Sequence, residues 1–130
     1  MRVLVVDDSS EVRAMYRRIV EGDDEIELVG EAANGREALD MVDETDPDVI
    51  VMDVHMPVLD GVVATRMIKE RRPEISVLGC SASDDDSMGR ALTDAGAAAH
   101  IDKAKAATLL VPIMKAIASA GPHLVDGDDS

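Results

Sequence analysis

Aromatic side chains are nearly absent from this sequence. Its 130 residues include one tyrosine and no phenylalanine or tryptophan. A surface that stacks nucleobases on aromatic rings is therefore excluded, and any hydrophobic core must consist of aliphatic side chains. Since 46% of the residues are hydrophobic, such a core is large enough for the single domain that this length favours.

Basic residues and cysteines are also few. The chain has 13 Lys and Arg against 27 Asp and Glu, which gives a formal net charge of −14. So acidic a domain is repelled by phosphate backbones and anionic lipids, and we expect it to bind neither nucleic acid nor membranes. The single cysteine, Cys80, excludes an internal disulfide. It falls in a predicted buried strand, so we interpret it as a core residue.

Long hydrophobic runs are absent as well. No apolar stretch approaches the roughly 20 residues that span a bilayer, and the N-terminus begins with a predicted strand rather than a signal peptide. We therefore expect a soluble, cytoplasmic protein. Residues 121–130 are rich in Gly, Pro and Asp, which predicts a flexible tail or truncated linker after one domain over residues 1–120.

What the sequence does contain is a fivefold alternation of strand-like and helix-like segments. Apolar runs predict strands at about residues 2–7, 26–29, 49–53, 75–80 and 98–101. Apolar residues at spacings of three and four predict helices between them, with candidate caps at Asn34, Asp60 and Ser83. Alternating units of this kind predict an α/β domain with a parallel sheet and helices on both faces. The first and third strands are the most apolar and should lie inside the sheet.

One residue conflicts with the helix that should follow the fifth strand. Leu110, Ile113, Met114 and Ile117 mark its apolar face, but Pro112 falls among them. A proline that deep in a helix removes a backbone hydrogen bond. We therefore expect this helix to start late or to kink.

Reactive side chains stand where four of the predicted strands end. Asp7 and Asp8 follow the first strand, and Asp53 ends the third. Ser81 follows the fourth strand, and Lys103 comes two residues after the fifth. Because the carboxyl ends of parallel strands share one edge of a sheet, where open α/β sheets place their ligands, all five side chains should face one cleft.

Three carboxylates at one cleft repel one another unless a cation lies among them. Oxygen ligands favour Mg²⁺, which is often shared with a phosphate, and the backbone carbonyl of His55 is a candidate further ligand. The Ser81 hydroxyl and the Lys103 ammonium suit an anion. A carboxylate can also be the nucleophile that forms an acyl phosphate. The pattern therefore predicts a site for a phosphoryl group beside a metal ion.

These motifs resemble the receiver domain of two-component response regulators. The matching segments are residues 3–8, 53–61, 80–82 and 95–103, and the resemblance covers nearly the whole chain, about residues 2–120. It implies a flavodoxin-like, three-layer α/β/α sandwich with a five-stranded parallel sheet of order 2-1-3-4-5. The stretch of residues 30–35 resembles the branch of the family with helix-turn-helix outputs.

The resemblance implies a role for each acidic residue. Asp53 is the phosphoacceptor, which takes a phosphoryl group from a histidine kinase or phosphotransfer protein. Asp7, Asp8 and Asp53 hold Mg²⁺ together with the His55 carbonyl, and Asp8 is a more direct ligand than Asp7. By this reading the protein is no enzyme beyond its own phosphorylation and dephosphorylation.

The resemblance also implies roles for the other residues. Ser81 and Lys103 join Asp53 in the catalytic set, and Ser81 is also a switch residue that moves on activation. His100 stands where the family usually has an aromatic switch ring, so it is either that switch or a half-exposed strand histidine. His55 and Ser83 occupy positions that tune the lifetime of the acyl phosphate.

The predicted switch lies on the face made by the fourth helix, the fifth strand and the last helix. This face is the candidate surface for a homodimer, for the kinase or for an output domain. Ala104 follows Lys103 where most receivers have proline, so the loop beside that face should be built differently.

Two other functions remain open on the residues alone. A Mg²⁺-dependent phosphatase or phosphotransferase would use Asp53 as its nucleophile, and turnover of free phosphate esters would identify it. Such an enzyme also needs a second acid, usually two residues later, where this chain has His55. A flavin-binding carrier of the same fold is disfavoured, because acidic residues stand where a phosphate loop is needed.

Overall fold

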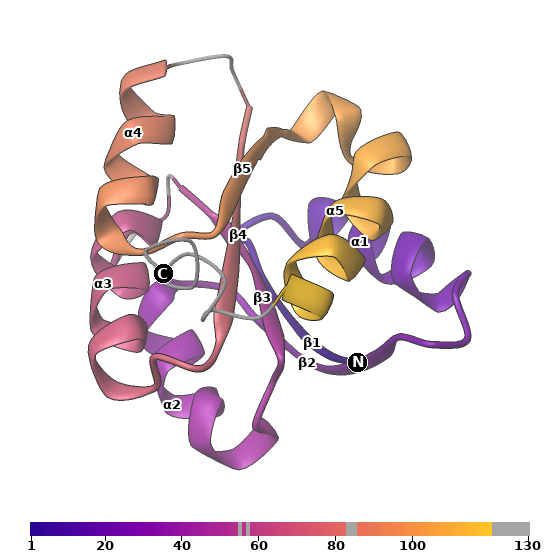
Figure 1. Ribbon diagram of the computed structural model, residues 1–130, viewed down its shortest axis with the longest axis horizontal. Coiled ribbons are helices and arrows are strands. Elements are labelled where there is room, and N and C mark those ends of the chain that lie inside the picture. The colour runs from indigo at the N-terminus through magenta and orange to yellow at the C-terminus, as the bar shows by residue number, and fades with distance from the viewer. Residues whose placement is uncertain (55, 57, 83–85, 121–130) are drawn as a thin grey trace.

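The structure is a computed structural model, and it describes residues 1–54, 56, 58–82 and 86–120. Strands and helices alternate along this part of the chain (Figure 1). The strands are β1 (Arg2–Val6), β2 (Glu27–Ala32), β3 (Val49–Asp53), β4 (Ser76–Ser81) and β5 (Ala99–Asp102). The helices are α1 (Ser10–Glu21), α2 (Gly35–Thr45), α3 (Gly61–Arg71), α4 (Asp86–Ala95) and α5 (Ala106–Ala120), and a short 3₁₀ turn, η1 (Lys103–Lys105), precedes α5.

The five strands form one parallel sheet of order β2-β1-β3-β4-β5. This is the predicted order, with β1 and β3 both in the interior. Val5 of β1 is paired with Val51 of β3, and Asp53 at the end of β3 is paired with Cys80 of β4. The register therefore brings the carboxyl ends of β1, β3 and β4 to the same edge.

The helices cover both faces of the sheet. Figure 1 shows α2, α3 and α4 on one side and α1 and α5 on the other. Alternate residues of each interior strand enter the two hydrophobic cores, as the twofold periodicity of a strand requires. Ile50 and Met52 pack under α2 and α3, whereas Val49 and Val51 pack under α1 and α5. Tyr16 is the one aromatic residue in this otherwise aliphatic interior.

Side-chain caps fix where three helices begin. Ser9 Oγ accepts the backbone N–H of Val12 at the start of α1 (3.2 Å), and Asp60 Oδ1 accepts that of Val63 at the start of α3 (2.9 Å). Asn34 Oδ1 caps α2 through the N–H of Glu37 (2.9 Å). Such caps satisfy backbone donors that have no partner within the helix. The predictions for Asn34 and Asp60 are confirmed, and Ser83 lies outside the described residues.

Of the two outcomes expected for Pro112, a late start of the last helix is wrong, and a kink stays a prediction. α5 begins at Ala106 and continues through Pro112 to Ala120. Leu110 and Met114 on its inner face are fully buried, while Pro112 is exposed. Burial of the apolar face therefore outweighs the hydrogen bond that the proline removes.

The end of α5 is also the last described position. The tail predicted for residues 121–130 lies outside the described residues, so the domain division at residue 120 stays a prediction. In the part of the chain that the structure describes, no helix has the length and apolar character needed to cross a membrane.

Candidate functional site

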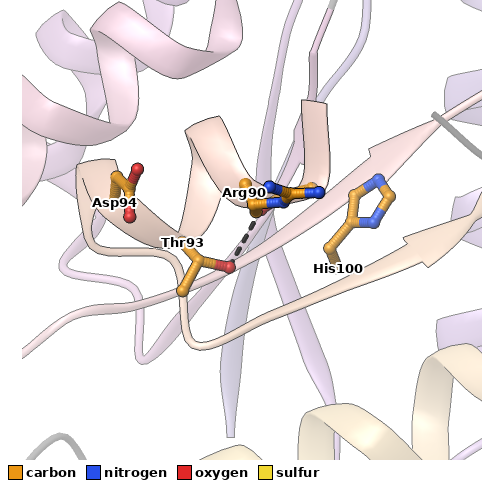
Figure 2. A pocket seen from close by; sticks show the side chains of 5 residues that line it. Arg90, Thr93, Asp94 and His100 are labelled. Atoms are coloured by element: carbon orange, nitrogen blue, oxygen red, sulfur yellow. Dashed lines mark hydrogen bonds between the residues drawn. The ribbon is translucent and has the colours of Figure 1, made fainter. Parts of the chain in front are cut away.

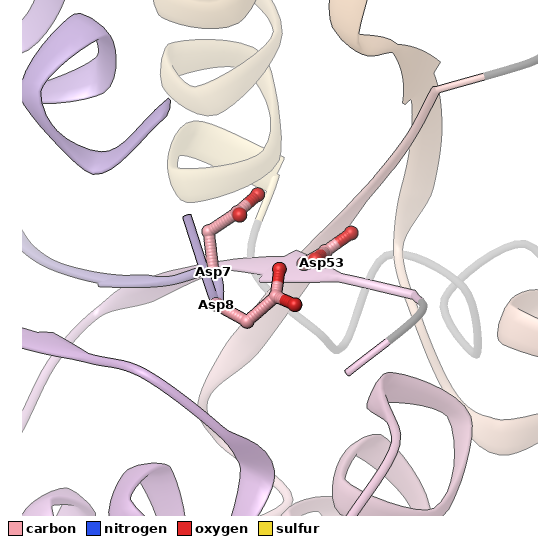
Figure 3. Close-up of side chains that lie close together, drawn as sticks. All are labelled: Asp7, Asp8 and Asp53. Atoms are coloured by element: carbon pink, nitrogen blue, oxygen red, sulfur yellow. The ribbon is translucent and has the colours of Figure 1, made fainter. Parts of the chain in front are cut away.

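Three carboxylates, those of Asp7, Asp8 and Asp53, gather where β1 and β3 end, and we call this group the acid pocket (Figure 3). One oxygen from each lies within 4.8 Å of the other two. Asp7 and Asp53 are buried, with 0% and 3% of their surface exposed, whereas Asp8 is exposed. The predicted convergence of these residues is confirmed, and Asp8 is the carboxylate most open to solvent.

Lys103 joins two members of the acid pocket. Its Nζ atom lies 2.8 Å from Asp7 Oδ2 and 2.9 Å from Asp53 Oδ1. Lys103 begins the η1 turn directly after β5, and this turn is held by Asp102, whose Oδ1 accepts the N–H of Ala104 at 2.9 Å. The loop with Ala104 in place of proline therefore still delivers the lysine to the carboxyl edge of the sheet.

Burial dominates the electrostatics of the acid pocket. Desolvation raises the pKa of Asp53 above its usual range, the ion pair with Lys103 opposes this, and the negative charge of Asp7 adds to it. For Lys103, desolvation alone lowers the pKa, but its hydrogen bonds to Asp7 and Asp53 outweigh burial and raise it. Lys103 is therefore charged, and one positive charge faces three carboxylates.

Close backbone contact holds the end of β3 against the start of α3. The N–H of Gly61 donates to the carbonyl of Val54 at 2.9 Å. A Cβ at Gly61 would lie only 1.9 Å from the carbonyl oxygen of Asp53, so no other residue fits there. Val58, in the same loop, has φ = 72° and is 80% exposed. That conformation is unusual for a β-branched residue, so this loop carries backbone strain beside the acid pocket.

Ser81 and His100 are in contact at the neighbouring strand ends. Ser81 Oγ and His100 Nε2 are hydrogen-bonded at 2.9 Å. The imidazole faces α4, where Gly89 leaves room for it, since a Cβ there would lie 3.2 Å from His100 Nδ1. A hollow of about 470 Å³ lies between β5 and α4, lined by His100 and by Arg90 and Thr93 of α4, among others (Figure 2).

His100 lies on β5, is half-buried and contacts the Ser81 hydroxyl, which fits both the switch and the half-exposed strand histidine. Its role in switching stays a prediction. His55 and Ser83, which we expected to tune the acyl phosphate, lie outside the described residues, and so does the His55 carbonyl predicted as a metal ligand.

Cys80 of β4 is paired with Asp53 of β3 and is fully buried. Burial raises the pKa of its thiol to about 12, so the thiolate that would make it reactive is not formed. The interpretation of Cys80 as a core residue is confirmed.

The sequence interpretation missed Arg13. This residue of α1 reaches back to the strand end, where its Nη1 atom donates to the carbonyl oxygen of Asp7 at 2.6 Å. A weak signal was available, because Arg13 follows Asp7 by six residues and shares one helix face with Arg17. The partner of both arginines is Glu31 on β2, which only the register of the sheet reveals.

The donor set of the acid pocket fits a small divalent cation. All three side chains offer hard oxygen ligands within reach of one ion, which is the chemistry that Mg²⁺ prefers. The exposed Asp8 carboxylate leaves the acid pocket in contact with solvent.

A family model described as the response regulator receiver domain matches residues 3–115 of the chain. The chain belongs to this family. The chemotaxis protein CheY of Halobacterium salinarum is 39% identical to this receiver domain over 102 residues, which cover 78% of this chain and 83% of CheY. The match to the family confirms the resemblance inferred from the strand-end motifs.

Two further proteins match nearly the whole of this chain. The transcriptional regulatory protein DegU of Brevibacillus brevis is 32% identical over 124 residues, 95% of this chain and 52% of DegU. A solved two-component response regulator of the LuxR family from Aurantimonas sp. SI85-9A1 superposes with a TM-score of 0.87 at 32% identity, covering 92% of this chain and 85% of that one.

The receiver domain therefore spans about half the length of DegU. A protein-glutamate methylesterase/protein-glutamine glutaminase of Syntrophomonas wolfei is 52% identical over 69 residues, which are 53% of this chain and 20% of that protein. The activities named for those longer proteins belong to them.

Proposed function

We propose that this receiver domain accepts a phosphoryl group on Asp53 from a histidine kinase or phosphotransfer protein, and that Asp7, Asp8 and Asp53 hold Mg²⁺ during the transfer. One observation carries the proposal. A buried carboxylate at the end of an interior strand is paired with Lys103 and lies among two further carboxylates. Membership of the receiver family supports the same function.

The transfer is a displacement at phosphorus. A carboxylate oxygen of Asp53 forms the new O–P bond while the bond from phosphorus to the imidazole nitrogen of the donor breaks, and the departing nitrogen keeps the electron pair. Lys103 is placed to balance the charge of the carboxylate and of the phosphoryl oxygens. When bound, Mg²⁺ would supply the further positive charge that these oxygens require.

Release of the phosphoryl group needs only water. Hydrolysis of the acyl phosphate gives inorganic phosphate and restores the Asp53 carboxylate, so the domain returns to its starting state without a separate active site. This self-dephosphorylation is the catalytic property we propose for the chain, alongside phosphorylation of itself.

The phosphoryl group on Asp53 changes both charge and hydrogen bonding near Ser81. We propose that Ser81 turns toward that group and gives up its bond with His100. Since His100 packs against Gly89 of α4, its release biases the face made by α4, β5 and α5. That face would then meet a second copy, an output domain or an effector.

The receiver function is favoured over a phosphatase or phosphotransferase acting on a small substrate. The family match covers residues 3–115, most of the chain. Nothing observed in the described residues favours the enzyme.

Phosphoryl uptake from acetyl phosphate and Mg²⁺ tests the proposal, with intact mass spectrometry as the measurement. The parent should gain one phosphoryl group, and Asp53→Asn should gain none. Asp60→Asn is the matched control, because asparagine caps α3 as well as aspartate does, and it should behave as the parent. Equal uptake by Asp53→Asn and the parent would reject Asp53 as phosphoacceptor.

A further inference from the structure

The turn between β1 and α1 presents two of the three carboxylates of the acid pocket. Local hydrogen bonds close this turn, since Asp7 Oδ1 accepts the N–H of Ser9 at 2.9 Å and the N–H of Arg13 donates to the carbonyl of Ser9 at 3.0 Å. The N–H of Asp7 donates to the carbonyl of Ala32 on β2 at 3.1 Å. The carbonyl of Asp7, in the peptide that leads to Asp8, is held by a group from another element.

The Arg13 side chain is that group. Its Nη1 atom donates to the carbonyl oxygen of Asp7 at 2.6 Å, and only 19% of the side chain is exposed. Arg13 therefore holds the peptide that links Asp7 to Asp8. Arg13 thus bonds both ends of the turn, Ser9 through its backbone N–H and Asp7 through its side chain.

Arg13 is itself held in place from the edge of the sheet. Glu31 on β2 has Oε1 at 3.5 Å from Arg13 Nε. Arg17, one turn further along α1, binds the same carboxylate with two bonds, Nε to Oε2 at 2.8 Å and Nη2 to Oε1 at 3.0 Å. The hydrogen bonds from Arg17 hold the pKa of Glu31 below its usual range, so the carboxylate stays charged. A chain of contacts thus runs from β2 through Arg13 to the acid pocket.

We propose that Arg13 is a positioning residue for the metal site, which fixes the backbone from which Asp7 and Asp8 reach a divalent cation. The inference rests on the proposed function, because it assigns a role in holding Mg²⁺. Ligands must be held within about 0.5 Å for a site to work well. Groups that orient the ligands typically change metal affinity by about 10- to 100-fold.

Positioning and plain charge make opposite predictions for Arg13. Its guanidinium is positive and lies beside the acid pocket, so by Coulomb's law alone its removal should strengthen the binding of a cation. If Arg13 instead orders the turn, its removal should weaken binding. The sign of the change therefore separates the two roles.

Calorimetric titration of the unphosphorylated protein with Mg²⁺ tests the proposal, with thermal unfolding in the absence of Mg²⁺ measured beside it. Arg13→Ala should weaken Mg²⁺ binding by about tenfold. Arg13→Lys keeps the charge and one donor and should show a smaller loss. Arg17→Ala is the matched control, because it also removes a positive charge and a Glu31 contact but leaves the bond from Arg13 to Asp7.

Each outcome bears on the proposal. Weaker Mg²⁺ binding in Arg13→Ala, with Arg17→Ala within about twofold of the parent, supports positioning by Arg13. Unchanged or tighter binding in Arg13→Ala overturns it, and so does an equal loss in Arg17→Ala, which would indicate general loosening of α1. If Arg13→Ala fails to fold, Arg13→Lys decides by the same comparison. A parent that binds no Mg²⁺ overturns the proposed metal site itself, and the Arg13 role with it.

Discussion

Two charged clusters lie at opposite edges of the sheet, and each combines three carboxylates with one basic side chain. At the carboxyl edge, Lys103 contacts Asp7 and Asp53 of the acid pocket, and Asp8 lies close to both carboxylates. The second, which we call the Arg72 cluster, joins Arg72 to Asp43, Asp46 and Glu74. It lies at the amino edge, where α2 and α3 end and β3 and β4 begin. The two clusters have the same formal charge and different surroundings.

The two clusters differ in how much of their carboxylate side chains is exposed to solvent. The three carboxylates of the Arg72 cluster are 57–70% exposed, whereas the side chains of Asp7 and Asp53 are 0% and 4% exposed. The hydrogen bond from Arg72 lowers the pKa of Glu74, while burial raises that of Asp53. In the Arg72 cluster, water solvates the carboxylates and screens the charge that Arg72 does not balance. At the acid pocket, two buried carboxylates share one ammonium with little help from water. The same set of charges is therefore a surface ion-pair cluster at one edge and a candidate metal site at the other.

Removing the cation from each cluster should give the largest difference between them. Lys103→Met keeps the apolar stem but leaves Asp7 and Asp53 buried without their cation, which typically costs about 3 kcal/mol of unfolding free energy. Arg72→Met should cost much less, because its partners are solvated. Chemical denaturation at neutral pH and without Mg²⁺ measures both.

Adding Mg²⁺ to the same two variants sharpens the comparison. The ion should restore part of the stability of Lys103→Met, since it replaces the missing positive charge in the acid pocket. It should leave Arg72→Met unchanged. Equal stability of the two variants, or equal rescue by Mg²⁺, would contradict the distinction between a buried and a solvated cluster.

The dependence of unfolding free energy on pH should have opposite signs at Asp53 and Glu74. We expect both changes to be smaller than the loss of stability in Lys103→Met. Folding raises the pKa of Asp53, so the folded state holds that proton more tightly than the unfolded state does. Ionisation of Asp53 therefore destabilises the fold, increasingly as the pH rises from the unfolded pKa of about 4 through the folded pKa. For Glu74 the folded pKa is lowered, so its contribution stabilises above the unfolded pKa and is lost as the pH falls through the folded one.

Denaturation curves between pH 3 and pH 8, without Mg²⁺, test these signs. Asp53→Asn should be more stable than the parent at neutral pH, with the gain disappearing in acid. Glu74→Gln should be less stable than the parent at neutral pH, with the loss disappearing in acid. Parallel curves for the parent and Asp53→Asn would show that burial does not perturb this carboxylate.

The sheet and the acid pocket could be predicted because the relevant signals are local. The apolar run of residues 49–52 fixes a buried strand, and the residue after it must stand at the sheet edge. The same argument places Asp7, Asp8 and Ser81. Once the strands are parallel, convergence of these residues follows without any knowledge of side-chain packing.

Other features depend on contacts between distant segments and could not be predicted. The bond from Arg13 to the Asp7 carbonyl requires the angle of α1 over β1, and the pairing of Glu31 requires the register of β2. The positive φ of Val58 contradicts its residue type, so no local rule indicates it. Pro112 misled the prediction of a late start for α5 because burial of Leu110 and Met114 outweighs local propensity.

Titration of Mg²⁺ into two matched carboxamide variants tests most directly whether burial makes the acid pocket a metal site. Asp8→Asn removes a carboxylate from the acid pocket, and Asp43→Asn removes one from the Arg72 cluster, so each changes the net charge equally. We predict one Mg²⁺ per parent chain, unchanged affinity in Asp43→Asn, and a loss in Asp8→Asn larger than the roughly tenfold that removal of an outer-shell partner costs. Equal affinities in both variants, or no Mg²⁺ binding by the parent, would contradict the account.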